Sequence, residues 1–254
     1  MEQWFVDLVE EIQSSSDLTE IKSILIKLCD QLEFENVAYA VKLPDTFTRI
    51  STLVISNYSE EWLRRYVEQG YFSIDPVAQH CFSSQQPYLW TRFTQANEKD
   101  LRQFAGEASE FNLNDGISIG MPRFNGETGL ISLATEKKIV MTPASIKRVI
   151  LYLNAMQPYI HEKIAQLSNV SGKKNIKVVL TEREKTCLVW VAEGKTAAEI
   201  ATILSVSEAT VVFHIKNAIQ KLNVTNRSQA IAKAVLLGLI APQFPKKAVP
   251  TYLF

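Results

Sequence analysis

Four short amphipathic helix patterns lie in the last third of the chain, and each begins at a side chain that caps helices. A Ser, Thr, Asp or Asn at this position accepts a hydrogen bond from a backbone amide that the first helical turn leaves unpaired. In a capping box, a Glu or Gln three residues later bonds back to the cap. The expected caps are Thr181 with Glu184, Thr196 with Glu199, Ser207, and Asn226 with Gln229. Four such signals in succession predict four consecutive helices.

The second and third of these helices have the spacing of a helix-turn-helix. They are expected over 197–204 and 208–222, joined by the short segment 205–207. In this motif the second helix of the pair enters the major groove of DNA. Its outer face would carry Ala209, Val212, Lys216 and Gln220 toward the bases. The residues expected to contact phosphates, by type and position, are Lys195, Thr196, Thr210, His214, Asn217 and Lys221.

Charge is distributed unevenly along the chain, although its formal net charge is zero. Residues 173–254 contain 12 Lys and Arg against 5 Asp and Glu, whereas residues 1–172 contain 15 against 22. A basic segment attracts the phosphate backbone of DNA, and an acidic segment is repelled by it. Ordinary solvated surface charge is the alternative explanation. Together with the helix spacing, the asymmetry favours a DNA-binding C-terminal part and a different task for the N-terminal part.

Length and composition limit the remaining possibilities. A chain of 254 residues with 46% apolar content can form two domains, and no apolar run approaches the ~20 residues that span a membrane. The N-terminus has no basic stretch followed by an apolar one, so we expect a cytoplasmic protein with no membrane partner. Cys29, Cys81 and Cys187 are scattered without metal-ligand spacing. They are expected to be buried free thiols, and neither a metal nor a cofactor is expected.

The N-terminal part alternates between helix and strand patterns. Apolar residues recur at helical spacing from Trp4 to Ile12 and from Ile21 to Leu32. The expected strands are 37–42, 50–56, 116–122 and 129–135, and further helices are expected at 60–69, 76–82 and 99–111. Helices before, between and after the strands predict an α/β/α sandwich with a central antiparallel sheet. With the four-helix C-terminal domain, the fold class is α+β.

The domain boundaries follow from one long helix and the segment after it. Thr142 and Pro143 are typical of a helix start, and apolar spacing continues to Leu167. Residues 168–177 lack an apolar period and are rich in turn formers. We therefore expect an N-terminal domain over 1–167, a linker over 168–177, a DNA-binding domain over 178–240 and a tail over 241–254. The prolines of the tail exclude a continued helix.

The C-terminal pattern resembles the DNA-binding domain of LuxR-type regulators over about 60 residues. The matching positions are Leu180 to Glu184, Leu188, Trp190, Ala192 to Thr196, Glu199 to Ala201, Ser207, Thr210, Val211, Phe213, His214, Asn217 and Lys221 to Asn223. One position departs from the family. Val212 stands where the family usually has Lys, Arg or Asn, and a valine can contact a thymine methyl but cannot hydrogen-bond a guanine.

The N-terminal part resembles the acyl-homoserine-lactone-binding domain of the same family. The residues that carry this resemblance are Asn57 to Trp62, Tyr66, Tyr71, Ile74 to Pro76, Trp90, Gly116 and Ser132, with Ser59 where the family has proline. By donor and acceptor type, Asp75 suits the amide N–H of such a ligand, Trp62 its lactone carbonyl, and Tyr58 and Ser132 its amide carbonyl. The resemblance implies these roles, and implies that Trp90 packs on the lactone ring while Tyr66 lines the site.

Plainer explanations exist for the same residues. Trp62 and Tyr66 are four residues apart on an expected helix, which is also typical of core packing. Asp75 and Pro76 are also explained by a helix start alone, with Asp75 as the N-cap and Pro76 at the first helical position. Glu184 is explained by its capping box alone. The occurrence of the whole set favours a binding pocket, whose depth for the acyl tail would depend on residues such as Val37, Tyr39, Val54 and Val77.

Taken together, the sequence predicts a ligand-responsive transcriptional regulator that is not an enzyme. It would bind an N-acyl-homoserine lactone and, as a homodimer, a pseudo-palindromic promoter, because a two-fold symmetric protein reads two half-sites. RNA polymerase is the expected partner at the promoter. One rival is the same fold sensing a different small molecule or none. Another is an N-terminal enzyme or protein-interaction module that the basic part tethers to DNA.

Overall fold

In the computed structural model of the 254-residue chain, residues 2–46, 48–90, 99–123, 125–137, 142–170 and 178–242 are described. The chain divides into two compact units, Met1–Lys173 and Lys174–Phe254. Each unit has hydrophobic clusters of its own. The two units are therefore described separately.

The first unit is built on a five-stranded sheet of order β2-β1-β5-β4-β3, in which all neighbouring strands pair antiparallel. Its strands are β1 (Asn36–Thr46), β2 (Arg49–Ser56), β3 (Tyr88–Leu89), β4 (Asp115–Pro122) and β5 (Thr128–Thr135). The central antiparallel sheet that the sequence predicts is thus confirmed. The two-residue strand β3 was not predicted, because so short a segment carries no alternation to recognise.

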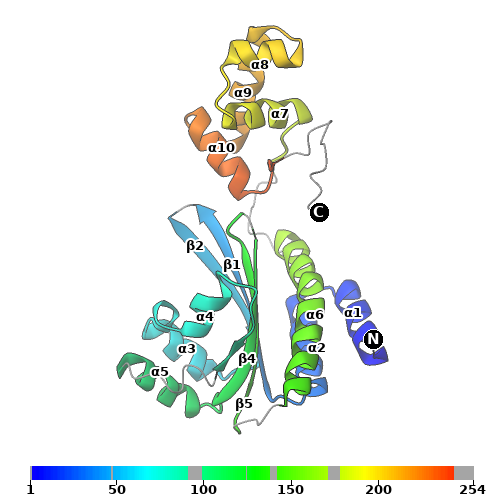
Figure 1. Cartoon of the computed structure of the whole chain (residues 1–254), viewed down its shortest axis with the longest axis vertical. Coiled ribbons are helices and arrows are strands. Elements are labelled where there is room, and N and C mark those ends of the chain that lie inside the picture. The colour runs from blue at the N-terminus through cyan, green and yellow to red at the C-terminus, as the bar shows by residue number, and fades with distance from the viewer. Residues whose placement is uncertain are drawn as a thin grey trace, which may run out of the picture. The chain divides into compact units, whose positions relative to one another are not determined.

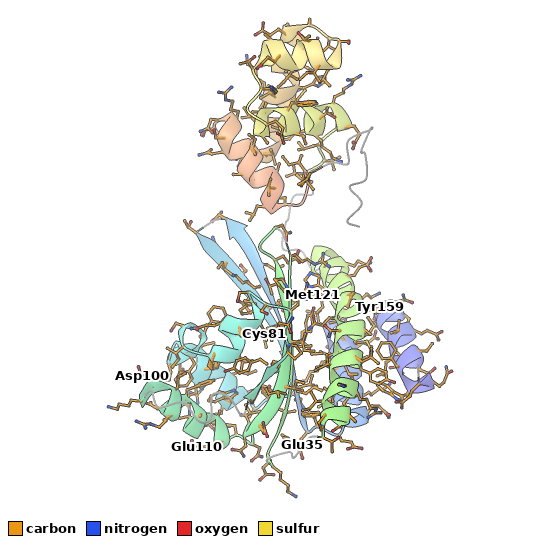
Figure 2. All side chains as sticks on the ribbon, viewed as in Figure 1. Glu35, Cys81, Asp100, Glu110, Met121 and Tyr159 are labelled. Atoms are coloured by element: carbon orange, nitrogen blue, oxygen red, sulfur yellow. The ribbon has the colours of Figure 1, made fainter. Side chains whose placement is uncertain are left out.

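Helices cover both faces of this sheet (Figure 1). One face carries α1 (Gln3–Ser14), α2 (Leu18–Gln31) and the long α6 (Pro143–Val170). The other carries α3 (Glu60–Glu68), the 3-10 turn η1 (Tyr71–Ser73), α4 (Pro76–Cys81) and α5 (Lys99–Ser109). Figure 2 shows side chains filling the space on both sides of the sheet. The unit is the predicted α/β/α sandwich.

Local chemistry explains where the helices start. The carboxylate of Asp17 accepts the amides of Thr19 and Glu20 at 2.8 and 2.9 Å, and Ser59 accepts the amide of Trp62 at 3.1 Å. Each bond satisfies an amide that the first helical turn leaves free. Helix α6 starts after Thr142, as predicted, but runs through Val170. The first three residues of the expected linker are therefore helical, since residues 168–171 contain no glycine or proline to end the helix.

The second unit is a bundle of four helices, α7 (Glu182–Ala192), α8 (Ala197–Leu204), α9 (Glu208–Leu222) and α10 (Arg227–Leu236). The predicted caps are confirmed: both capping boxes are closed, and Ser207 and Asn226 cap α9 and α10. Gly194 and Gly238 take positive φ angles of 80° and 65°. Helices α8 and α9 are bent by 109° across their turn, which is the geometry of a helix-turn-helix.

Among the described residues, no single helix is both long and apolar enough to span a membrane, and only α8 and α9 taken together across their bend meet the length and composition criteria.

Candidate functional site

The sheet face under α3, α4 and α5 is lined with small side chains. Ser56 pairs with Ala38, Ala38 with Ser132, and Ser132 with Ser118, so these four residues form one row across four strands. Residues directly opposite each other in a sheet share a face. Small residues in such a row leave room between the sheet and the helices above it.

Aromatic side chains from the covering helices meet above this row. Trp62 is 3% exposed, and its ring centroid lies 5.5 to 6.0 Å from those of Tyr66, Tyr71, Phe104 and Phe111. Trp90 and Tyr58 belong to the same hydrophobic cluster. The structure thus brings together the four aromatic residues that the sequence assigns to a ligand site. Phe104 and Phe111, which the sequence analysis did not assign, complete the aromatic wall.

Asp75 places a carboxylate at the edge of this cluster. Its Oδ1 caps α4 by accepting the amides of Val77 at 2.8 Å and Ala78 at 3.3 Å, and its Oδ2 accepts the hydroxyl of Tyr66 at 2.8 Å. Burial raises the pKa of Asp75, whereas these three hydrogen bonds oppose that rise. Capping therefore engages one oxygen of the side chain, and the other oxygen faces Tyr66 of the aromatic cluster. Because a carboxylate oxygen has two lone pairs, Oδ2 can accept a further N–H.

A second polar element runs along the sheet. The indole of Trp90 donates to Ser118 Oγ at 2.8 Å, and Ser118 Oγ lies 2.7 Å from Ser132 Oγ. Ser132 is one of the predicted site residues, and Ser118 is not. The sequence pattern places Ser118 in the expected strand 116–122 but does not say which strand pairs with it. Only the pairing of β4 with β5 shows that Ser118 lies opposite Ser132. These two hydroxyls hold the Trp90 ring against Gly116, where an added Cβ would lie 2.9 Å from the ring.

Three buried hydroxyls in this part of the described chain have no hydrogen-bond partner, Ser56 Oγ, Tyr58 Oη and Tyr71 Oη. An unpaired buried hydroxyl costs about 1 to 3 kcal/mol. Burial raises the pKa of Tyr58, so its hydroxyl remains protonated and can donate. Unpaired buried polar groups are rare in proteins and call for a partner. A ligand with carbonyl oxygens would supply one.

The expectation that Val37 and Tyr39 limit the depth of the pocket is wrong. Val37 and Tyr39 are fully buried in the cluster on the opposite face, where Tyr39 Oη lies 3.3 Å from Nδ1 of His161 on α6. Alternation along β1 sends odd-numbered residues to that face and Ala38 and Ala40 toward α4. Val54 pairs with Ala40, so it shares the sheet face toward α4, where it is 46% exposed. Val77 does belong to the aromatic cluster.

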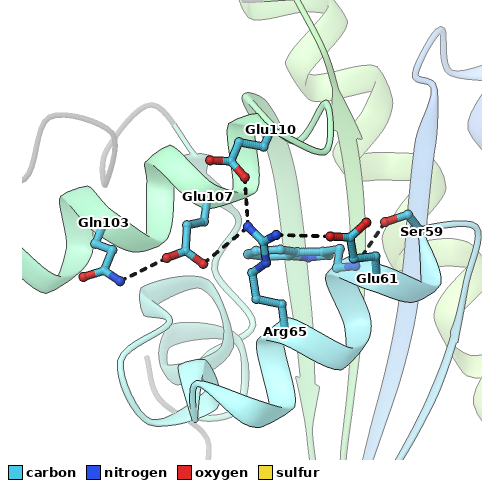
Figure 3. Close-up of polar contacts among 7 residues, drawn as sticks. Ser59, Glu61, Arg65, Gln103, Glu107 and Glu110 are labelled. Carbon is cyan, nitrogen blue, oxygen red and sulfur yellow. Dashed lines mark hydrogen bonds and ion pairs between the residues drawn. The ribbon is translucent and has the colours of Figure 1, made fainter.

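An arginine fastens α5 to α3 above the site (Figure 3). Arg65 Nη1 lies 2.8 Å from Glu110 and 3.8 Å from Glu107, and its Nη2 lies 3.2 Å from Glu61. The guanidinium also stacks 4.9 Å from the ring centroid of Phe111. Because Arg65 follows Trp62 by one turn of α3, this cluster fixes α5, and with it Phe104 and Phe111, over the Trp62 ring.

The described residues of this region offer no sign of catalysis. Cys81 is fully buried, and burial raises the pKa of its thiol to about 12, so it is not a thiolate at neutral pH. All three cysteines are buried and free, as predicted. Within the described ranges, no three His, Cys, Asp or Glu side chains are placed to hold a metal ion.

The second unit presents the outer face of α9. Ala209, Val212 and Lys216 are exposed on it, whereas Val211, Ala218 and Leu222 are fully buried on the opposite side. The expected phosphate contacts near the start of the motif have local bonds: Lys195 lies 3.9 Å from Glu199, Thr196 caps α8, and Thr210 Oγ1 lies 2.7 Å from Ser207 Oγ. His214 and Asn217 are half-buried.

Lys221 is engaged inside its own domain. Its Nζ donates to Glu184 Oε2 at 2.8 Å, joining α9 to α7. Glu184 is 2% exposed, and the same Oε2 closes the capping box by accepting the amide of Thr181 at 2.8 Å. Burial alone would raise the pKa of Glu184, but the bonds from Lys221 and Thr181 together lower it. The sequence placed Glu184 in a capping box and Lys221 on DNA, and it did not predict this ion pair.

We expect Lys221→Met to destabilise the second unit by about 2 kcal/mol, because a buried carboxylate loses its charged partner. Lys185→Met is the matched control, since Lys185 forms an ion pair of the same 2.8 Å length with Glu182, which is 85% exposed. That exposed pair should contribute below about 0.5 kcal/mol. Hydrogen exchange of α7 and α9 in the full chain measures both, and equal protection in the two variants would contradict the prediction.

The lowered pKa of Glu184 gives this pair a pH dependence. A carboxyl whose pKa is lower in the folded state stabilises the fold above its ordinary value of 4.5, and this stabilisation is lost as the pH falls through the lowered pKa. The difference in protection between wild type and Lys221→Met should therefore shrink on acidification below pH 4.5.

Known proteins share both units. A family model described as an autoinducer binding domain matches residues 17–164, and one described as bacterial regulatory proteins of the luxR family matches residues 178–234. The transcriptional activator AnoR of Acinetobacter nosocomialis is 34% identical over 240 residues, covering 94% of this chain and 100% of AnoR. The quorum-sensing regulator RhlR of Pseudomonas aeruginosa is 32% identical over 241 residues, covering 93% and 96%.

A solved structure agrees with the fold. Crystalline SdiA of Escherichia coli superposes with a TM-score of 0.71 at 29% identity, covering 94% of this chain and 98% of SdiA. A second SdiA structure, in complex with octanoyl-rac-glycerol, gives a TM-score of 0.70 at 28% identity. An autoinducer-binding domain followed by a helix-turn-helix defines a ligand-responsive transcriptional regulator. The chain belongs to the LuxR family of such regulators, which act in quorum sensing and are not enzymes.

Proposed function

We propose that the protein binds an N-acyl-homoserine lactone between the sheet and helices α3, α4 and α5. The observation that carries the proposal is the group of buried hydroxyls without a partner, Ser56 Oγ, Tyr58 Oη and Tyr71 Oη, the last two of which lie in the aromatic cluster around Trp62. Such a ligand offers one amide N–H, two carbonyl oxygens and an apolar tail. Asp75 would accept the N–H, Tyr58 and Ser132 would donate to the amide carbonyl, and Trp62 would donate to the lactone carbonyl.

The remaining two residues of the predicted set shape the site. Trp90 would pack on the lactone ring, because its indole is held by Ser118 at the sheet surface. Tyr66 would line the site and orient the Asp75 carboxylate through its 2.8 Å hydrogen bond. The aromatic cluster around Trp62 supports an apolar lining for the acyl tail.

A second candidate ligand is an acyl glycerol, because the related SdiA was solved with octanoyl-rac-glycerol. An acyl glycerol has an ester carbonyl and hydroxyls but no amide N–H. Its ester carbonyl would accept from Tyr58 and Ser132, and a glycerol hydroxyl would donate to Asp75 in place of the amide N–H. The two ligand classes therefore differ in the donor that they offer Asp75, because a hydroxyl can also accept a hydrogen bond and an amide N–H cannot.

The test is the thermal unfolding midpoint of the full chain with acyl-homoserine lactones of increasing tail length. Ligand at one hundred times its dissociation constant stabilises the folded state by about 2.7 kcal/mol, which corresponds to a rise of roughly 5–10 °C for a unit of this size. Bare homoserine lactone is the control for the tail, and octanoyl glycerol tests the second class. A rise that peaks at one tail length supports the proposal, and a folded protein that responds to none of the lactones contradicts it.

We further propose that the second unit binds pseudo-palindromic promoter DNA as a homodimer and contacts RNA polymerase there, in the cytoplasm where the chromosome lies. One recognition helix per half-site follows from two-fold symmetry. The base-facing residues would be Ala209, Val212 and Lys216, with Lys195, Thr196, Thr210, His214, Asn217 and Lys221 near the phosphates. Exposed apolar residues on α6 and after α10, such as Leu151 (60%) and Leu237 (41%), support these segments as dimer surfaces.

A further inference from the structure

The outer face of α9 has an aromatic residue at its centre. Phe213 follows the fully buried Val211 by two residues, which is about 200° around an α-helix. Its side chain therefore points directly away from the domain core, and it is 59% exposed. Its neighbour Val212 is 36% exposed on the same side. Phe213 is one of the residues that carry the family resemblance, but residue type alone predicts no role for it.

Packing within the domain does not account for this phenylalanine. The ring meets the edge of the His214 ring at a centroid distance of 5.6 Å, and the hydrophobic clusters of the second unit do not include Phe213. An apolar side chain gains about 25 cal/mol for each Å² that is removed from water. In the free protein most of the Phe213 side chain remains in water, so this free energy becomes available only when a binding partner covers the ring.

We propose that Phe213, together with Val212, reads the C5-methyl groups of thymines in the major groove, an inference that rests on the proposed DNA binding. Both residues lie in the first half of α9, the part of a recognition helix that contacts base edges. Among the major-groove edges of the four bases, only thymine presents a methyl group, and phenylalanine and small apolar side chains contact it.

The next turn of the helix supplies the polar partner. Lys216 is exposed three residues after Phe213 and four after Val212, so it lies beside them on the same face. A lysine at a base edge suits the O6 and N7 acceptors of guanine. The rise of 1.5 Å per residue puts Lys216 about 4.5 to 6 Å along the helix axis from the two apolar residues, about one to two base-pair steps. The geometry therefore points to a half-site in which a thymine lies within two base pairs of a guanine.

The experiment begins with selection of duplexes from a random library by the full-length protein and its stabilising ligand. Each thymine of the selected site is then replaced by uracil, which removes the methyl group alone. We expect one or two thymines per half-site at which the replacement weakens binding about threefold to fivefold at fixed salt. Uracil at the other thymines should have no effect.

Phe213→Ala should weaken binding to the selected site and should abolish the effect of uracil at the sensitive thymine. Phe213→Leu should retain part of both. Val179→Ala is the control variant, because Val179 is 65% exposed but lies outside the helix-turn-helix. Phe213 contributes little to the fold, so circular dichroism should show unchanged unfolding.

The possible failures are distinguishable. Selection of no duplex by a folded, ligand-bound protein would contradict the proposed function itself. A selected site without thymine, or one insensitive to uracil, would overturn the methyl readout while DNA binding stands. The methyl readout would also be overturned if Phe213→Ala kept the uracil effect. It would be overturned as well if this variant changed the oligomeric state of the protein without DNA, which would assign Phe213 to a protein–protein surface.

Discussion

Asp75→Asn is expected to fold like the wild type and to lose most of its affinity for an acyl-homoserine lactone. Asparagine caps helices as well as aspartate does, so its Oδ1 keeps the amides of Val77 and Ala78. Its Nδ2 replaces the Oδ2 that accepts from Tyr66, and a tyrosine oxygen can accept in turn. A ligand N–H would then face a donor. The loss of a charged acceptor and the unpaired N–H together cost about 2–4 kcal/mol, or roughly 30- to 1,000-fold in affinity.

Thermal unfolding with and without ligand measures this prediction directly. The unliganded midpoint of Asp75→Asn should stay within about 2 °C of the wild type, while the ligand-induced rise disappears at the same ligand concentration. Asp17→Asn is the matched control, because Asp17 caps α2 through two amides in the same way but lies outside the aromatic cluster. Its ligand response should be unchanged. A normal rise in Asp75→Asn would remove Asp75 from the site.

The same variant separates the two ligand classes. A glycerol hydroxyl can donate to the Asp75 carboxylate and can accept from the Nδ2 of asparagine, whereas an amide N–H can only donate, so binding of an acyl glycerol should depend less on the carboxylate. If octanoyl glycerol stabilises both the wild type and Asp75→Asn, whereas acyl-homoserine lactones stabilise only the wild type, both molecules use the same pocket through different contacts.

Local chemistry made most of the fold predictable. The caps at Thr181, Thr196, Ser207 and Asn226 stand in the sequence beside the helices they start, and each was found there. Helix α6 shows the limit of such reasoning, since it runs three residues beyond the predicted end at Leu167. Strand β3 has two residues, and its place in the sheet is set by its pairing with Ser118 and Ile117 of β4.

The site was harder to predict because it depends on which strands pair. Period-2 alternation tells which residues of β1 share a face, but not which face the ligand helices cover. Tyr39 was therefore expected at the pocket and lies against His161 on the other side. The ion pair between Lys221 and Glu184 joins two residues that are 37 positions apart in the sequence, and no local sequence pattern predicts it. Residue type alone likewise did not single out Phe213, whose significance lies in its exposure.

Gly120→Ala is expected to have the largest effect on stability in the first unit. Gly120 lies on β4, and a Cβ there would overlap the carbonyl oxygen of Cys81 and lie 2.6 Å from the carbonyl oxygen of Ser84. Both are backbone atoms at the end of α4 and just after it, so relief requires the helix to move. Such overpacking costs about 3 kcal/mol or more, which lowers the unfolding midpoint by roughly 6–12 °C.

Displacement of α4 should also weaken ligand binding. Asp75 caps this helix, and Val77 and Cys81 of α4 belong to the aromatic cluster, so Gly120→Ala should reduce the ligand-induced rise as well as the unliganded midpoint. Gly106→Ala provides the control on α5, where a Cβ meets no atom within 4 Å. Alanine there should stabilise the helix by about 0.5–1 kcal/mol. Equal unfolding midpoints for the two alanine variants would contradict the close contact between Gly120 of β4 and the backbone at the end of α4.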